Sequence, residues 1–259
     1  MTAGFNVTES FDVTGKVVMI TGGSRGLGKA MSLAFAERGA KVVVASRKIE
    51  ECEKVVRELR VLGTEAMAIA CHVGHWDSLE EVVERVVKKF GRIDVLINNA
   101  GMSPLAPSLL ETSEALFDKI IDVNLKGPTR LTALVATRMG DTGGGSIINI
   151  SSLASYRPSP MTTVYSAAKA GLNALTAASA QEYAPVGVRV NCVVCGTFDT
   201  DAAAGMISNP DILPHIVDPV ALKRIGEPEE VVGAALYFAS AASSYTTGAC
   251  LTIDGGVRP

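Results

Sequence analysis

Near its amino end the chain reads Val17-Val18-Met19-Ile20-Thr21-Gly22-Gly23-Ser24-Arg25-Gly26-Leu27-Gly28. The mostly apolar run before the glycines predicts a short buried strand. Gly22, Gly26 and Gly28 then predict a turn into a helix. Such glycines let the backbone approach a phosphate, and the first N–H groups of the helix attract its negative charge. The segment therefore predicts a phosphate-binding turn, with a plain strand-to-helix connection as the alternative.

The same stretch nearly matches the phosphate loop of nucleoside triphosphatases. Residues 23–29 fit that loop, but Ala30 stands where Ser or Thr would bind Mg²⁺. A triphosphatase is therefore kept only as an alternative.

Short Val- and Ile-rich runs alternate with helical periodicity along the whole chain. The predicted strands are 17–21, 41–45, 66–70, 93–97, 146–150, 188–194 and 249–253, and the predicted helices are 26–38, 48–61, 78–90, 113–139, 161–184 and 227–241. This alternation predicts an α/β fold, a Rossmann-like doubly wound parallel sheet of about seven strands with helices on both faces. Residues 1–259 are predicted to form one dinucleotide-binding and catalytic domain with a short amino-terminal tail at 1–14.

Two segments depart from the alternation. Residues 198–223 form a connection longer than most in compact domains, which indicates a lid over a substrate. The helix after Tyr165 is small or apolar almost all round, which favours a subunit contact.

The end of the second strand bears on cofactor choice. In dinucleotide-binding folds a carboxylate there accepts the ribose hydroxyls of NAD. Here the strand ends in Ser46-Arg47-Lys48, without a carboxylate. Arg47 and Arg25 would instead pair with a 2′-phosphate. NADP(H) is therefore the predicted cofactor, with NAD(H) as the alternative.

Tyr165 and Lys169 are the strongest chemical signal in the chain. On a helix their i, i+4 spacing puts them on one face. A tyrosine has a reference pKa of about 10, and a nearby cation favours its ionised form. Ser151 and Ser152 stand close before the tyrosine. The group predicts proton-transfer chemistry.

Composition excludes several classes of protein. The formal net charge of −3 and the scattered basic residues argue against nucleic acid binding. No apolar run is long enough to span a bilayer and no signal-peptide pattern is present, so we expect a cytoplasmic protein with no membrane contact. The five cysteines, including Cys192 and Cys195, are expected to be reduced structural thiols, with no metal site.

Over about 15–256 the chain resembles the short-chain dehydrogenase/reductase family. The resemblance rests on the glycine turn, Asn98-Asn99-Ala100-Gly101, Val123-Asn124, Ile150-Ser151-Ser152, the Tyr165–Lys169 pair and Asp254-Gly255-Gly256. It implies a catalytic tetrad of Asn124, Ser152, Tyr165 and Lys169. In that tetrad Ser152 would hydrogen-bond the carbonyl oxygen, Tyr165 would donate the proton, Lys169 would also bind the nicotinamide ribose, and Asn124 would hold a relay water.

The resemblance also implies the cofactor contacts and a homotetramer. The expected contacts are Gly22, Ser24, Arg25, Gly26, Leu27, Gly28, Ser46, Arg47, His72, Val73, Asn99, Ala100, Gly101, Tyr165, Lys169, Gly196, Thr197 and Thr200. Two positions depart from the family pattern: Cys195 replaces a proline, and His72 replaces an aspartate near the adenine.

The predicted activity is NADP(H)-dependent interconversion of a small-molecule carbonyl and a secondary alcohol. Within the family the alternatives are an NAD-dependent alcohol or sugar dehydrogenase and a 3-oxoacyl reductase. A dinucleotide-binding scaffold without chemistry is the alternative from another class. The predicted substrate-pocket residues are Met102, Leu153, Ala154, Ser155, Met161, Phe198 and Met206.

Overall fold

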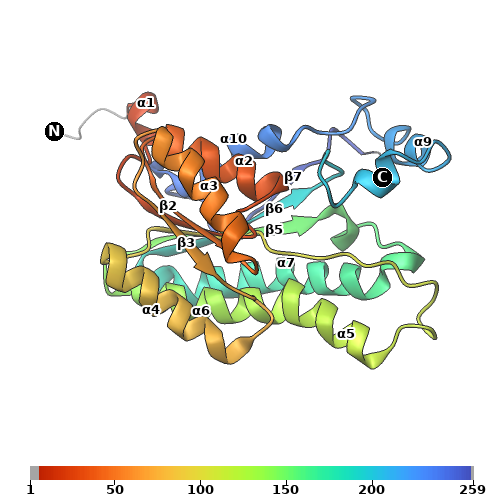
Figure 1. The fold of residues 1–259 in the computed structure, drawn as a ribbon, viewed down its shortest axis with the longest axis horizontal. Helices are drawn as coiled ribbons and strands as arrows, with labels where there is room; N and C mark the ends of the chain where they lie inside the picture. The colour runs from red at the N-terminus through yellow and green to blue at the C-terminus, as the bar shows by residue number, and fades with distance from the viewer. Residues whose placement is uncertain (1–5, 258–259) are drawn as a thin grey trace.

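The computed structural model describes residues 6–257, and within them seven parallel strands form one sheet (Figure 1). In spatial order the strands are β3 (Ala66–Ala70), β2 (Lys41–Ser46), β1 (Val17–Thr21), β4 (Val95–Asn98), β5 (Gly145–Ser152), β6 (Val188–Cys195) and β7 (Cys250–Ile253). The chain fills the sheet outward from β1 to β3, then returns to pair β4 with the other side of β1. This confirms the predicted α/β class and the seven strands.

Helices cover both faces of the sheet, as Figure 1 shows. One face carries α2 (Gly26–Glu37), α3 (Ile49–Val61) and α10 (Val232–Ala239). The other carries α4 (Leu79–Phe90), α6 (Gly127–Gly140) and α7 (Thr163–Tyr183), with α5 (Glu114–Ile121) extending beyond the sheet. The central strands are therefore shielded from water on both sides.

Burial on both faces explains the near-continuous apolarity of the strands. All five residues of β1 are buried, and alternate positions belong to different cores. Val18 and Ile20 pack towards α2 and α10, whereas Val17 and Met19 pack towards α4 and α6. A strand covered on both faces needs apolar side chains at odd and even positions alike.

The predicted helix 113–139 is interrupted in the structure. Between α5 and α6 the residues Asp122–Lys126 form a π-helical turn. Asn124 Nδ2 donates to the Ile120 carbonyl oxygen four residues earlier at 2.9 Å. A side chain that occupies this acceptor competes with the helical ladder, which accounts for the local widening. The predicted helical span is confirmed, since the three segments follow one another without a break, but periodicity did not reveal the π-helical turn inside it.

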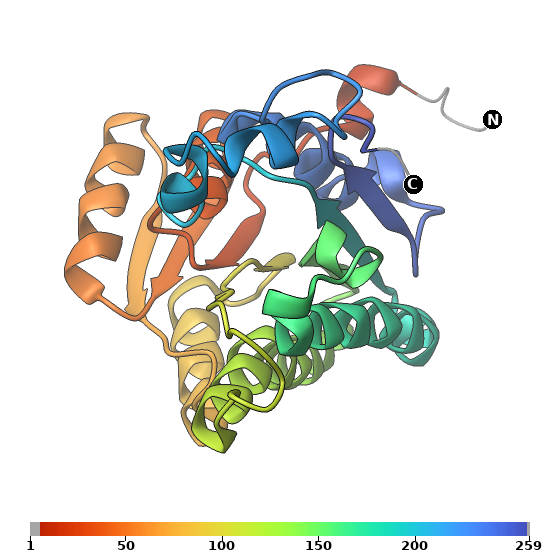
Figure 2. The same ribbon diagram turned by 90° about the vertical axis from the view of Figure 1, so that its right-hand side faces the viewer.

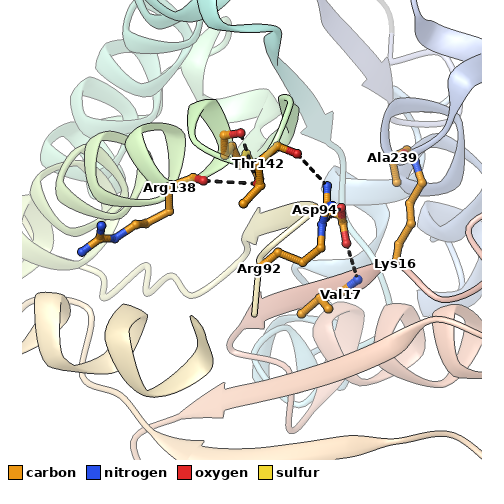
Figure 3. A network of polar contacts seen from close by, with 8 residues as sticks. Lys16, Val17, Arg92, Asp94, Arg138, Thr142 and Ala239 are labelled. Atoms are coloured by element: carbon orange, nitrogen blue, oxygen red, sulfur yellow. Dashed lines mark hydrogen bonds and ion pairs between the residues drawn. The ribbon is translucent and has the colours of Figure 1, made fainter. Parts of the chain in front are cut away.

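A polar network joins the elements at the amino ends of the strands (Figure 3). Asp94 Oδ2 accepts from the buried backbone N–H of Val17 at 2.8 Å, and Asp94 Oδ1 accepts from Arg92 Nε at 2.7 Å. Arg92 also donates to the Thr142 carbonyl oxygen at 3.2 Å, and Lys16 Nζ donates to the Ala239 carbonyl oxygen at 3.0 Å. At the amino ends of the strands these polar groups are therefore paired with other groups of the same chain.

The carboxyl ends of the strands, which face the viewer in Figure 2, are covered by long connections. The predicted lid, residues 198–223, contains the short helices α8 (Ala204–Ile207) and α9 (Leu213–Val217). Of the predicted tail, residues 1–5 lie outside the described residues, and Val7–Ser10 form the short helix α1. Val13 is buried in the core on the α2 face, so this part of the predicted tail packs against the rest of the domain.

Candidate active site

A cavity of about 670 Å³ lies at the carboxyl ends of the strands. It extends from the glycine turn after β1, past the ends of β2 and β3, to α7 and the start of the lid. The predicted cofactor and catalytic residues that line it are Gly22, Arg25, Gly26, Leu27, Ser46, Arg47, His72, Val73, Asn99, Ala100, Gly101, Ser152, Tyr165, Lys169, Gly196, Thr197 and Thr200. Of the predicted site residues, Ser24, Gly28 and Asn124 do not line the cavity.

The glycine turn holds its shape through close backbone approaches. Gly22 has a φ of +65°, which favours glycine. A Cβ on Gly28 would overlap the Gly22 carbonyl oxygen, so Gly28 fixes the start of α2 without lining the cavity. Asn99 Nδ2 donates to the Thr21 and Gly22 carbonyl oxygens at 2.9 and 3.2 Å. The turn therefore opens the amino end of a twelve-residue helix, α2, towards the cavity.

Arg25 and Arg47 form the cationic end of the cavity. Both side chains line it, one from the residue before α2 and one from the end of β2. Among residues 6–257 neither guanidinium has a hydrogen bond or an ion pair. Two unpaired cations beside a glycine turn fit a phosphate-bearing dinucleotide such as NAD(P).

His72 and Val73 lie at the same end of the cavity. His72 stacks on His75 with ring centroids 4.1 Å apart, and its Nδ1 accepts from the Gly74 N–H at 3.2 Å. Burial, followed by the nearby His75 and Arg47, lowers the pKa of His72. A neutral, stacked imidazole therefore occupies the predicted adenine region.

Lys169 is buried beside Tyr165 on α7. Its Nζ donates to the Ile150 carbonyl oxygen at 2.8 Å and lies 5.8 Å from the centre of the Tyr165 ring. No ion pair within residues 6–257 includes Lys169, and burial lowers its pKa to about 8. The cation is thus close to the phenol while lacking a carboxylate partner of its own.

Tyr165 differs from the sequence expectation in the direction of its pKa. Burial raises that pKa, and a hydrogen bond with Ser152 only partly opposes the rise. The predicted lowering of this pKa by Lys169 does not appear, and desolvation of the phenolate by burial is the largest effect. The phenol therefore holds its proton at neutral pH.

Ser152 ends β5 with its hydroxyl next to the phenol. Its Oγ interacts with Tyr165 and also accepts from the Ala154 N–H at 3.2 Å. Ser151, by contrast, is buried and lies 3.3 Å from the Lys169 carbonyl oxygen, which fits a supporting position.

Asn124 is buried under the cavity wall. Its Nδ2 donates to the carbonyl oxygens of Met102 and Ile120, each at 2.9 Å, and its Oδ1 accepts from the Met102 N–H at 3.2 Å. These bonds fix the segment after Gly101 against the π-helical turn. Asn124 therefore supports the site from behind.

The far end of the cavity is largely apolar. Of the predicted pocket residues, Met102, Phe198 and Met206 line the cavity, and Leu153, Ala154, Ser155 and Met161 do not. Cys195 also lines it, and burial raises the pKa of its thiol to about 12. Three more lining residues, Val123, Ile150 and Ser151, belong to motifs that the sequence analysis quoted without assigning them a contact, and the lining residues that it did not single out are Cys71, Ser103, Pro104, Lys119, Asp201, Ala202 and Ala203.

A family model described as enoyl-(acyl carrier protein) reductase matches residues 22–258. Dehydrogenase/reductase SDR family member 4 of Pongo abelii is 34% identical over 254 residues, covering 98% of this chain and 91% of that protein. A 3-oxoacyl-[acyl-carrier-protein] reductase of Thermotoga maritima is 40% identical over 248 residues, covering 94% and 98%. The chain belongs to the short-chain dehydrogenase/reductase family.

Solved structures of family members agree with this assignment. A putative NAD(P)-dependent gluconate 5-dehydrogenase from Beutenbergia cavernae, with bound NADP, has a TM-score of 0.91 at 30% identity, covering 95% of this chain and 98% of that one. A 7α-hydroxysteroid dehydrogenase complexed with NADH and 7-oxo glycochenodeoxycholic acid has a TM-score of 0.92 at 32% identity, covering 98% of both chains. The protein is accordingly a short-chain dehydrogenase/reductase enzyme that uses NAD(P) on a carbonyl or CH–OH group.

Two further findings concern the rest of the described chain. No helix in residues 6–257 has the length and apolarity needed to cross a membrane. In the same residues no group of three or more His, Cys, Asp or Glu side chains is arranged to hold a metal ion.

Proposed function

We propose that this family member is an NADP(H)-dependent reductase of apolar ketones, with Tyr165 as the general acid. The observation that carries the proposal is the shape of one cavity: a hydroxyl, a phenol and an ammonium meet at its centre, and two unpaired guanidiniums lie at one end. When bound, the nicotinamide supplies the hydride for the carbonyl carbon. The chain's own residues then have to manage the oxygen and its proton.

Ser152 and Tyr165 are suited to that oxygen. Their hydroxyl groups interact with each other, so a carbonyl oxygen entering between them would accept a hydrogen bond from each. Negative charge that develops on this oxygen during reduction is stabilised by donors already in place. Because burial raises the pKa of Tyr165, the phenol carries the proton that the product alcohol needs.

Lys169 would stabilise the phenolate left after proton transfer. Its ammonium is close to the Tyr165 ring, and although burial lowers its pKa to about 8, it is still mostly charged at neutral pH. A buried cation without a carboxylate partner favours an adjacent anion. Lys169 thereby lowers the cost of the charged state without itself touching the substrate.

Preference for NADP(H) is supported by Arg25 and Arg47. The test is a fluorescence titration with NADPH and NADH of the wild type, Arg47→Leu and the neighbouring control Lys48→Leu, since Lys48 does not line the cavity. We expect Arg47→Leu to weaken NADPH binding roughly 10- to 100-fold, as for loss of a charge-assisted hydrogen bond, and NADH binding little. Equal affinity of the wild type for both cofactors would contradict the preference.

The substrate class is supported by the apolar lining of Met102, Phe198 and Met206. A turnover panel with NADPH would compare apolar ketones, sugars and a 3-oxoacyl thioester, and the proposal requires the ketones to give the highest kcat/KM. A carrier-linked 3-oxoacyl substrate is the second candidate, favoured by the Thermotoga maritima relative. Against it, Arg130 is engaged with Glu80 and stacked on Trp76, which leaves it poorly placed to attract an acidic carrier.

The lid remains a proposal supported by position. Phe198, Thr200, Ala203 and Met206 all line the cavity from residues 198–223. We expect hydrogen exchange across this segment to slow when NADPH is added, and an unchanged rate would contradict a covering role.

A homotetramer is also proposed, and so is the cytoplasmic location. Ala170, Ala174 and Ala177 form an exposed face of small side chains on α7, which would allow a second helix to approach closely. Sedimentation of the wild type beside Ala174→Glu tests this contact: a tetramer that dissociates in the variant supports it, and an unchanged mass contradicts it.

A further inference from the structure

Two thiols face each other across the last pair of strands. Cys192 of β6 and Cys250 of β7 are Cα partners in the parallel register. Partners in neighbouring strands lie about 4.8 Å apart, and their side chains project from the same face of the sheet. Cys192 is fully buried, whereas Cys250 is partly exposed at the edge strand.

This spacing suits a disulfide. Disulfides join residues whose Cα atoms lie about 4.4–6.8 Å apart, so the register requires no large backbone movement. The thiols of Cys192 and Cys250 are close enough for each to shift the pKa of the other, and Tyr156 also acts on Cys250. Both cysteines are free thiols in the structure.

The two thiols differ in reactivity in a way that suits oxidation. The interaction with Cys192, and then that with Tyr156, lowers the pKa of Cys250 to about 6, whereas the other three cysteines have raised values. The contact with Cys250, together with burial, raises the pKa of Cys192. Since the thiolate is the form that attacks an oxidant, Cys250 is the thiol that reacts first.

A chain of side chains leads from this pair to the catalytic loop. The Cys192 thiol donates to Asn173 Oδ1, with 3.4 Å between sulfur and oxygen. Asn173 Nδ2 donates to Ser155 Oγ at 2.9 Å, and Ser155 Oγ donates to the Ser152 carbonyl oxygen at 2.7 Å. The state of the Cys192 thiol is thus linked to the backbone of Ser152.

We propose that Cys192 and Cys250 are a peroxide-sensitive thiol pair that closes into a disulfide and slows turnover through Asn173 and Ser155. In the first step the Cys250 thiolate attacks hydrogen peroxide: an S–O bond forms, the O–O bond breaks, and hydroxide leaves, which is protonated to water. In the second step the Cys192 thiolate attacks the Cys250 sulfenic acid, forming the S–S bond and releasing a second hydroxide. Overall, two thiols and one hydrogen peroxide give one disulfide and two waters.

The second step becomes easier once the first has occurred. A sulfenic acid is neutral, so the neighbouring anion that raised the pKa of Cys192 is removed. Closure is intramolecular, so the burial of Cys192 does not prevent it. In the product Cys192 has no proton, and Asn173 Oδ1 loses that donor.

Peptide mapping of the full-length protein tests the site without relying on the proposed activity. The protein is treated with hydrogen peroxide, blocked with N-ethylmaleimide under denaturing conditions and digested. Fragmentation spectra are needed because Cys192 and Cys195 share a tryptic peptide. We expect a Cys192–Cys250 link that dithiothreitol removes, in the wild type and in the control Cys52→Ser, and none in Cys250→Ser or Cys192→Ser. Sulfinic acid at Cys250 without a link, or a Cys250–Cys250 link between two copies, would overturn the proposal.

Turnover tests the connection to Ser152. Losing one hydrogen bond in the chain should reduce kcat roughly threefold in the oxidised wild type, reversibly with dithiothreitol, and leave Cys250→Ser unaffected by peroxide. A disulfide that forms with unchanged kcat would overturn the connection. Failure of the proposed ketone activity would instead show as absent turnover before any oxidant is added.

Discussion

The polar groups at the amino ends of the strands differ from those at the carboxyl ends in whether they have partners within the chain. At the amino ends, Asp94, Arg92 and Lys16 are paired with neighbouring backbone or side chains (Figure 3). At the carboxyl ends, Arg25 and Arg47 have no partner in the described chain, and Lys169 is buried without a carboxylate. The polar groups at the amino ends therefore contribute to stability, whereas those at the carboxyl ends are the ones that we propose to contact ligands.

The largest expected effect concerns Tyr165. Replacing Tyr165 by Phe removes the proposed proton donor while leaving the ring in place, so kcat should fall roughly 10²- to 10⁴-fold. Steady-state kinetics with NADPH measure the loss of kcat. Urea unfolding should show that the free energy of unfolding changes by no more than about 1 kcal/mol. If the variant kept the wild-type kcat, the proposed role of Tyr165 would be wrong, and the contrast between the two ends of the strands would lose its main support.

Asp94 should give the reverse result. Asp94→Ala leaves the buried Val17 N–H without its acceptor, which should cost about 2–3 kcal/mol of unfolding free energy. Activity per folded molecule should stay near wild type. The control is Asp141→Ala, because Asp141 is exposed and makes only a 3.9 Å ion pair with Arg138. Equal losses in both variants would contradict a bridging role for Asp94.

Lys169 should make stability depend on pH. Its folded pKa of about 8 lies below the unfolded value, so the folded state binds fewer protons between about pH 8 and 10.5. Stability contributed by this group must therefore rise with pH across that window, by about 3 kcal/mol. Urea unfolding of the wild type and Lys169→Met at several pH values measures the contribution of the lysine together with its interaction with the thiols of Cys192 and Cys195. Parallel pH profiles would show that the lysine is not desolvated.

The smallest expected effect is the difference in stability loss between substitutions of Arg92 and of Arg47. Arg92→Ala removes an exposed ion pair and a hydrogen bond to Thr142, which should cost under about 1 kcal/mol. Arg47→Ala removes no partner, so its thermal midpoint without cofactor should equal that of the wild type. A clear loss of stability in Arg47→Ala would reveal an intramolecular partner and weaken its assignment to a phosphate.

The sequence predicted the parts of the molecule that depend on local pattern. Val-rich strands buried on both faces and the glycine turn at 22–28 have signals that survive without tertiary information. The Tyr165–Lys169 spacing likewise placed both groups on one face of α7.

Other features depended on contacts that no local pattern records. Burial set the direction of the Tyr165 pKa, and the side chain of Asn124 created the π-helical turn. Lys119 and Ala203 line the cavity only because distant segments converge there. In each case the deciding quantity was desolvation or long-range packing.

The strand order has a consequence for how the protein folds. The cavity lies where β1 meets β4, and the contact from Val17 to Asp94 joins residues 77 apart in the chain. Its lining comes from both halves of the sheet, so neither half alone can form a complete binding site. A ligand held there favours only the fully assembled state, and at one hundred times its dissociation constant it would add about 2.7 kcal/mol to stability. The cellular supply of cofactor would thereby influence how long each molecule survives proteolysis.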